Sequence, residues 1–193
     1  MKILLTLALA LLACTAPHVV ESPAPSGPSV SVAITRGLDW TDWREDQRIA
    51  IESYLPTLSR VGVQWVLVRE DRADVLIRSW DSGEGCAQGA ARYTRGTPYV
   101  EVDAACVQGI AALRYAVGHE LLHWISARRS LWLGHVCKRD TDALDCHPTV
   151  RGRSLLNPIL PEDPSDEALG AMLLDPSPTD TDRALLRELG ITR

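Results

Sequence analysis

In the first half of the chain, apolar residues recur with a period of two, which is typical of β-strands. Val30, Val32 and Ile34 alternate with smaller residues. Later segments are rich in Val, Ile, Leu and Trp, which favour a pleated, half-buried surface. A short turn at residues 95–97 separates the last two segments and indicates a hairpin. The pattern therefore predicts five strands, at residues 30–34, 63–68, 73–80, 90–94 and 98–102.

Between residues 107 and 127 the apolar period changes to three and four, which places apolar side chains on one face of a helix. The predicted buried stripe comprises Ile110, Leu113, Val117, Leu121 and Trp124. Other residues near the two histidines of this segment have small side chains. The pattern predicts a helix with its core on one side and a cleft on another.

Two further helices are expected on either side of this central one. Thr41 or Asp42 can cap the first, which runs toward residues 54–55 and is disturbed by Pro56. The second lies near the C-terminal end of the chain. Its cap is expected at Thr179 or Asp180, its body at residues 182–189 and its end at Gly190.

The central helix carries the sequence His119-Glu120-Leu121-Leu122-His123. Because side chains four residues apart share a helical face, both imidazoles can bind one metal ion. Glu120 lies one step round the helix and can polarise a metal-bound water as a general base. The alternative is a helix whose histidines merely face solvent, but a solvated face would be richer in Lys and Glu. The motif therefore predicts a zinc hydrolase.

A catalytic zinc site needs a third protein ligand and leaves a fourth position for water. His18 lies in a proline-rich stretch near the N-terminus and is expected to be solvated. His135 is the favoured ligand, because Gly134 can adopt the left-handed geometry that turns a chain back beneath a helix end. The other candidates are His147, Asp140 and Asp142.

These segments together resemble the metzincin metallopeptidases, and among them the matrixin-like branch. The resemblance rests on residues 119–123, on Leu-Gly-His at 133–135, and on Ser-Leu-Leu-Asn-Pro at 154–158. In that clan HExxHxxGxxH supplies three histidine ligands, and a later turn, often S-x-M-x-P, forms the floor under the metal. The resemblance implies Zn²⁺ as cofactor and Glu120 as catalytic residue. It implies His119, His123 and His135 as metal ligands, and Leu156, Asn157 and Pro158 as the equivalent of the methionine turn.

The chain departs from the metzincin pattern in three places. Arg129 stands where the third ligand is usual, and its permanently protonated guanidinium cannot bind zinc. Ser126 replaces the usual glycine, and an insertion at about residues 126–131 would postpone the third histidine. Leu156 replaces the floor methionine with an apolar side chain of similar volume. Met172 is a rival for this turn but lacks the Ser-x-x-Asn-Pro frame.

The resemblance also implies a fold and a substrate cleft. The expected fold class is α/β (α+β), a single zincin-like domain with a twisted mixed sheet and an antiparallel edge strand. A small C-terminal subdomain, ending in a helix, would follow the HExxH helix. In this family the outer strand of the hairpin pairs with an extended substrate, and residues after the floor turn line an apolar side-chain pocket. The corresponding residues here are Ala90, Ala91, Arg92, Tyr93, Thr94, Ile159 and Leu160.

Composition indicates one globular domain that does not bind nucleic acid. The chain has 193 residues and a formal net charge of -5, with acidic and basic residues mixed rather than in blocks. Its 46% apolar residues and six Trp argue against disorder. We expect residues 29–193 to form the catalytic domain and to act as a monomer.

The N-terminal residues indicate export. Residues 3–13 are apolar except for Thr6. This apolar run is too short to cross a bilayer, and it predicts a signal peptide at residues 1–13. Leu-Leu-Ala-Cys at 11–14 resembles the bacterial lipobox, which implies a lipidated Cys14 followed by a flexible linker over residues 14–28. An ordinary secretory leader is the alternative. The expected location is the bacterial cell envelope, with a lipid anchor as the membrane contact, or outside the cell.

The remaining cysteines predict disulfide bonds. Four is an even number, and the expected compartment is oxidising, so two bonds are expected. We prefer a bond that joins the loop before the hairpin to the start of the central helix, and a second that closes a small loop. A second metal site is the alternative, although no C-x-x-C pair exists. The preferred pairs are Cys86 with Cys106 and Cys137 with Cys146.

The sequence thus predicts a zinc-dependent endopeptidase that cleaves a peptide or protein substrate, with Glu120 as general base. Two other classes fit parts of the pattern. One is a zinc-binding envelope protein without proteolytic activity, and the other is a lipid-anchored module that binds an extended peptide by strand addition. Retention of Glu120 argues against both, because a structural zinc site has no use for a general base.

Overall fold

The computed structural model describes residues 27–36, 42–80, 91–107, 109–130, 134–137, 146–151, 153–156 and 176–193. Several predictions lie outside these ranges, among them the signal peptide and most of the linker. Only the backbone is described for some other residues. The site residues outside the described ranges are Cys14, Cys86, Ala90, Asp140, Asp142, Asn157, Pro158, Ile159, Leu160 and Met172, and those described by backbone alone include Arg129, Cys137, Cys146 and His147.

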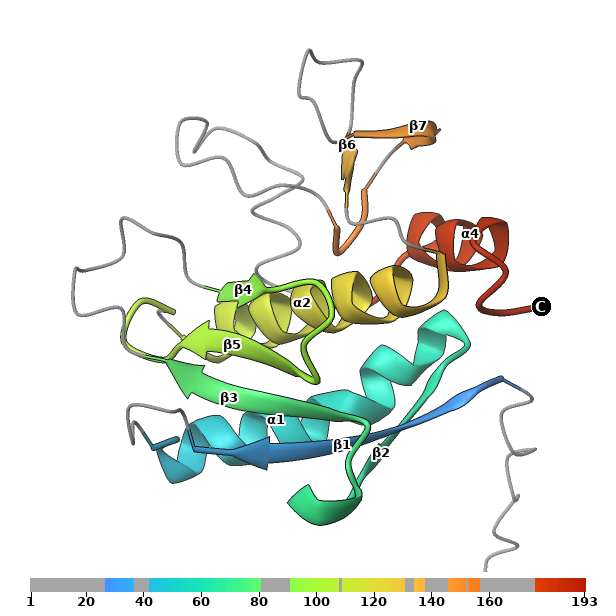
Figure 1. Ribbon diagram of the computed structural model, residues 1–193. Helices are drawn as coiled ribbons and strands as arrows, with labels where there is room; N and C mark the ends of the chain where they lie inside the picture. Colours follow the sequence, from blue (N-terminus) through green and yellow to red (C-terminus); the bar gives the residue numbers. More distant parts are fainter. Residues whose placement is uncertain are drawn as a thin grey trace, which may run out of the picture.

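The first half of the chain forms a five-stranded sheet with the order β2-β1-β3-β5-β4 (Figure 1). Four strands are parallel, and β4 pairs antiparallel with β5 at the edge. The predicted mixed sheet with an antiparallel edge strand is therefore confirmed, and every strand end lies within two residues of the one expected. The strands are β1 (Ser29–Thr35), β2 (Gln64–Leu67), β3 (Val75–Trp80), β4 (Ala91–Tyr93) and β5 (Tyr99–Asp103).

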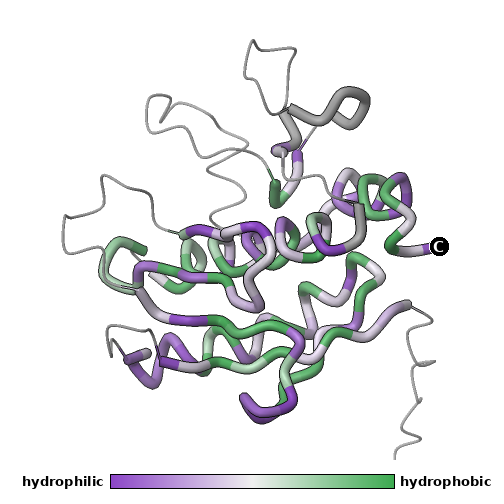
Figure 2. The backbone as a smooth tube through the Cα atoms, in the orientation of Figure 1, coloured by the Kyte–Doolittle hydropathy of each residue, from purple (hydrophilic) through white to green (hydrophobic). Residues whose placement is uncertain are grey.

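Alternation along the strands decides which side of the sheet is buried. In β3, Val75 and Ile77 are fully buried, whereas Leu76 and Arg78, which alternate with them, are half-buried. The buried residues join one apolar core with helices α1 (Glu45–Leu58) and α2 (Ile110–Ser130), which contact each other and the sheet. Figure 2 shows apolar stretches on the strands and on α2, and a hydrophilic turn at η2 (Glu70–Arg72).

Helix α1 differs from its prediction at both ends. Its N-cap is Arg44 rather than Thr41 or Asp42, because the Gln47 side chain accepts a hydrogen bond from the Arg44 backbone N–H at 3.1 Å. The same Gln47 amide donates to a carbonyl at the end of β5, so burial of this glutamine fixes where the helix begins. At the other end the helix continues through Pro56, and the fully buried Leu58 completes its last turn.

Helix α2 is buried on more sides than its apolar stripe predicted. Four of the five stripe residues are buried, but Ile110 is 37% exposed because it begins the helix. Leu122 and Ile125, which lie off the stripe, are also buried. The C-terminal part of the chain covers this second side, since its leucines belong to the same core. These leucines are Leu155, Leu156, Leu185 and Leu186.

The C-terminal region contains the predicted closing helix, α4 (Asp180–Glu188). Thr179 is its N-cap, and Gly190, with a φ of 67°, follows its end as predicted. The sequence did not predict the parallel pair β6 (His135–Cys137) and β7 (Cys146–Arg151), nor the turn η1 (Ser59–Val61) as a short 3₁₀ helix. None of the helices in the described part is both long and apolar enough to cross a bilayer.

Candidate metal centre

Three histidines from two elements meet beside α2. His119 and His123 come from the helix, and His135 begins β6, which lies above α2 in Figure 1. One ligand atom from each residue lies within 4.8 Å of the others. The Nε2 atoms of His119 and His123 are 3.0 Å apart. The structure therefore brings together the three histidines that the sequence analysis selected.

The arrangement fits a late transition metal ion. Zn²⁺ binds imidazole nitrogen at about 2.0–2.1 Å with tetrahedral angles, which places two such nitrogens about 3.3 Å apart. The 3.0 Å between the Nε2 atoms of His119 and His123 is close to that spacing. Three imidazoles suit zinc and its neighbours, whereas calcium and magnesium prefer oxygen ligands. The residues could therefore hold one metal ion of this class.

A backbone carbonyl fixes the orientation of His119. Its Nδ1 lies 2.6 Å from the carbonyl oxygen of Leu155. Because a carbonyl only accepts hydrogen bonds, Nδ1 must carry the proton, and the Nε2 lone pair is left free for a metal. The ring is therefore held in the tautomer that a metal ligand needs.

The turn that supplies this carbonyl is held by Asp182 of α4. The buried Asp182 carboxylate accepts hydrogen bonds from the Ser154 hydroxyl at 2.5 Å and the Leu155 backbone N–H at 2.9 Å. It also accepts one from the Thr179 backbone N–H at 2.7 Å. Burial raises the pKa of the Asp182 carboxyl, and the hydrogen bonds from Ser154, Thr179 and Leu155 oppose that rise. Residues 154–156, the described part of the predicted floor turn, thus lie against the metal centre.

Sequence reasoning missed Asp182. Its signal was the Thr179-x-x-Asp182 spacing, in which each side chain bonds the other residue's backbone as a capping box. That spacing predicts a helix start, but it contains no information about Ser154 or Leu155. The long-range contact depends on how α4 packs, which a local motif does not specify.

Burial shifts the pKa values of the titratable groups around the site. It raises the pKa of Glu120 to about 8 and lowers that of His119 to about 4. Burial, with the neighbouring histidines, also lowers the pKa of His123. Both helix histidines are therefore neutral at pH 7 and can bind a metal without first losing a proton. Tyr115, whose ring centroid is 5.8 Å from that of His119, has its pKa raised by burial and by the charges of Asp182 and Glu120.

Strand β4 carries the described part of the expected substrate cleft. It is the edge strand of the sheet and contacts α2. Its Arg92 bonds Glu101 of β5 at 2.7 Å and stacks over the Trp80 ring at 3.9 Å, so this side chain is held against the sheet. Among the described residues, β4 has no strand partner on its outer edge. Cys106 is disulfide-bonded, and the preferred pairing with Cys86 stays a prediction because Cys86 lies outside the described residues.

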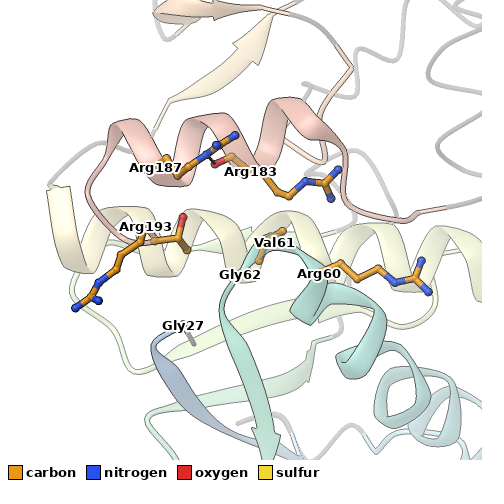
Figure 3. Close-up of a pocket in the computed structure, with 8 residues that line it drawn as sticks. Gly27, Arg60, Val61, Gly62, Arg183, Arg187 and Arg193 are labelled. Carbon is orange, nitrogen blue, oxygen red and sulfur yellow. Dashed lines mark hydrogen bonds between the residues drawn. The ribbon is translucent and has the colours of Figure 1, made fainter. Parts of the chain in front are cut away.

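Two of the cavities on the described surface bear on a binding role. The larger, of about 430 Å³, lies between η1, α4 and the C-terminal residues, and Figure 3 shows its arginines. Arg60 and Arg193 extend away from each other there, and Arg183 pairs with Asp180. This cavity is a positively charged depression whose guanidinium groups do not converge. The smaller, of about 320 Å³, lies between the β4–β5 turn and the last turns of α2.

No protein-family model matches the chain, and no curated protein matches it significantly in sequence. The structure of myroilysin matches with a TM-score of 0.37 and 12% identity, over 52% of this chain and 48% of that one. The chain thus spans about half the length of that structure. The GM1-bound form of the ECX AB5 holotoxin matches with a TM-score of 0.49 and 12% identity, over 86% of this chain and 81% of that one. At this similarity neither structure identifies the function, so the family resemblance rests on the motifs.

Proposed function

We propose that this chain is a zinc-dependent endopeptidase that hydrolyses peptide bonds in a peptide or protein substrate. The observation that carries the proposal is the meeting of His119, His123 and His135, with a buried carboxyl, Glu120, next to His119 in the sequence. Three ligands leave a position open for water, as in catalytic rather than structural zinc sites. A general base next to that position is what hydrolysis requires.

The residues of the site would have two separate roles, metal binding and proton transfer. His119, His123 and His135 would hold the ion through neutral imidazoles. A bound Zn²⁺ would supply Lewis acidity, lowering the pKa of a coordinated water and polarising the substrate carbonyl. Glu120 would accept a proton from the attacking water and return it to the leaving amine nitrogen, as the C–N bond breaks and a C–O bond forms.

Burial of Glu120 supports this role. A carboxyl whose pKa lies near neutrality both accepts and returns protons readily, and burial alone raises that of Glu120 to about 8 without a metal. A nearby cation would lower this pKa again. The same burial excludes bulk water from the place where the proton moves. A solvent-exposed glutamate would lack both properties.

The test is peptide hydrolysis by the zinc-loaded protein and by Glu120→Gln, measured on casein and on a quenched fluorescent peptide. We expect Glu120→Gln to retain zinc and to lose about 10²- to 10⁴-fold in kcat, since only proton transfer is removed. Glu45→Gln, in the exposed first turn of α1, is the matched control and should keep full activity. A chelator should abolish hydrolysis by the unmodified protein.

Two results would contradict the proposal. Near-normal turnover by Glu120→Gln would remove the general base from the mechanism. Zinc binding without hydrolysis of any peptide would instead support a non-proteolytic metal protein or a peptide-binding module.

A further inference from the structure

The smaller cavity lies at the edge of the sheet where β4 turns into β5. Tyr93 of β4 and the turn residues Arg95 and Thr97 form one wall, and the C-terminal turns of α2 form the other. Its volume of about 320 Å³ is enough for one amino-acid side chain. We call it the hairpin pocket. Its helix residues are Trp124, Ala127 and Arg128.

Helix geometry relates the hairpin pocket to Glu120. Trp124 and Ala127 follow Glu120 by four and seven residues, so all three lie on one face of α2. At 1.5 Å per residue, these two side chains lie about 6 Å and 10 Å along the helix from the proposed general base. The pocket is therefore on the side of α2 that faces the proposed reaction.

An extended peptide advances about 3.3 Å per residue. A substrate lying along the outer edge of β4, with its scissile bond beside Glu120, would therefore place a side chain two or three residues away over the pocket. In the described part of the chain no strand pairs with the outer edge of β4. Edge strands offer unpaired backbone groups to such a peptide.

The charge of the hairpin pocket indicates which kind of substrate side chain it would bind. Arg128 stacks over the Trp124 ring at 5.0 Å and lies 3.9 Å from Asp74, which also accepts a hydrogen bond from the Ser31 backbone N–H. Arg95, across the pocket, has no carboxylate within ion-pair distance among the described residues. Two guanidinium groups thus face a single, already engaged carboxylate. The excess positive charge suits an anionic side chain.

We propose that the hairpin pocket binds a glutamate or aspartate side chain of the substrate, two or three residues from the scissile bond. Arg95 supplies the free guanidinium, and Arg128, held by Trp124, supplies the second. This inference rests on the proposed endopeptidase function and specifies its substrate class: extended peptides that carry an acidic residue near the cleaved bond.

The experiment compares quenched peptides that differ only by Glu, Gln or Lys at the second and third residues on each side of the scissile bond. At one of these positions, we expect Glu to exceed Gln by about fivefold in kcat/KM, and Lys to fall below Gln. Arg95→Glu should reverse the order, with Lys now favoured. Arg60→Gln, an exposed arginine beside the other cavity, should leave the order unchanged.

Peptide binding to Glu120→Gln, followed by fluorescence anisotropy, separates this inference from the proposed function. If the unmodified protein cleaves peptides without preference for Glu, and Arg95→Glu changes nothing, the pocket assignment is wrong while the peptidase stands. If no peptide is cleaved but Glu120→Gln still binds the Glu peptide more tightly than the Gln peptide, the pocket stands and the hydrolase does not.

Discussion

Asp182 is the residue that links the C-terminal helix to the metal centre. It lies at the start of α4, yet its carboxylate holds the backbone at Leu155, and the Leu155 carbonyl orients His119. Groups that orient a ligand in this way typically change metal affinity by 10- to 100-fold when removed. The chain from Asp182 to His119 explains why a helix distant in sequence matters to the site.

We predict that Asp182→Asn weakens both the fold and the metal site. The amide keeps the shape but replaces one acceptor oxygen by a donor, which faces the N–H groups of Leu155 or Thr179. The free energy of unfolding should fall by about 1–3 kcal/mol, and metal affinity by about tenfold or more. Denaturant unfolding and competition with a chromogenic chelator measure these effects.

Asp180→Asn, in the same helical turn, is the matched control for that prediction. The side chain of Asp180 is 96% exposed and pairs only with Arg183 among the described residues, so its loss should leave metal affinity unchanged. An Asp182→Asn protein that binds metal as tightly as the unmodified one would show that the turn needs no such support.

Glu120 also predicts how the stability of the metal-free protein depends on pH. Its pKa is about 8 in the folded protein and near 4.5 when unfolded, so the folded state holds the proton more tightly. Its contribution to stability is present below pH 4.5 and is lost as pH rises through 8. Glu120→Gln should therefore gain about 2 kcal/mol relative to the unmodified protein between pH 6 and pH 8.

Chelator-treated samples unfolded in denaturant at each pH provide this measurement. His119 and His123, whose pKa values are lowered, lose stability as pH falls below about 6.5. They are common to both proteins, so the difference between the two isolates Glu120. A difference that does not change with pH would mean that Glu120 is not buried in the folded state.

The sequence predicted the metal-binding residues better than the residues that hold them in place. The spacing of His119, Glu120 and His123 is a local property of a helix, and Gly134 made His135 a sensible third candidate. The position of β6 confirmed that His135 lies beside them. The role of Asp182 could not be predicted, because it depends on two segments that meet only in the folded chain.

At the scale of elements, the close packing of α1 against α2 positions the metal-binding helix. A Cβ added at Gly118 would lie 2.6 Å from the Tyr54 hydroxyl oxygen of α1. That hydroxyl donates a 2.5 Å hydrogen bond to the Pro176 carbonyl. Gly118, next to His119 in the sequence, therefore allows one tyrosine to join α1, α2 and the segment before α4.

We predict that Gly118→Ala destabilises the protein by about 1–3 kcal/mol, although alanine is the better helix former. The added methyl group must displace Tyr54 or separate the helices. The double variant with Tyr54→Phe should lose less than the sum of the two single changes, because the hydroxyl in conflict is gone. Thermal unfolding of all four proteins measures the coupling. Strictly additive losses would contradict the contact.

Strand and helix positions were largely predictable, because periodicity reports which faces are buried. The errors occurred where tertiary contacts determine the end of a helix or which of its sides is buried. The Gln47 side chain fixes the N-cap of α1 at Arg44, and C-terminal leucines bury a second side of α2 that the apolar stripe did not include. The strands of the β6–β7 pair are short, and their apolar residues do not alternate regularly with polar ones, so the pattern carried no strand signal.

At the scale of the whole molecule, the proposed metal would connect its two parts. His119 and His123 belong to the sheet and helix part, whereas His135 belongs to the β6–β7 pair that follows. A bound ion stabilises the folded state by mass action, and here it would also hold β6 against α2. The third ligand would therefore add a metal-dependent attachment of β6 to the core packing that already holds the C-terminal leucines against α2.

Metal content per chain shows whether His119, His123 and His135 together bind the ion. After dialysis against zinc-free buffer, the unmodified protein should retain about one zinc ion per chain, as a three-histidine site implies. His135→Ala should lose most of it, because two ligands bind zinc far more weakly than three, and His147→Ala should retain it. Loss of zinc from His147→Ala with retention by His135→Ala would contradict the assigned site.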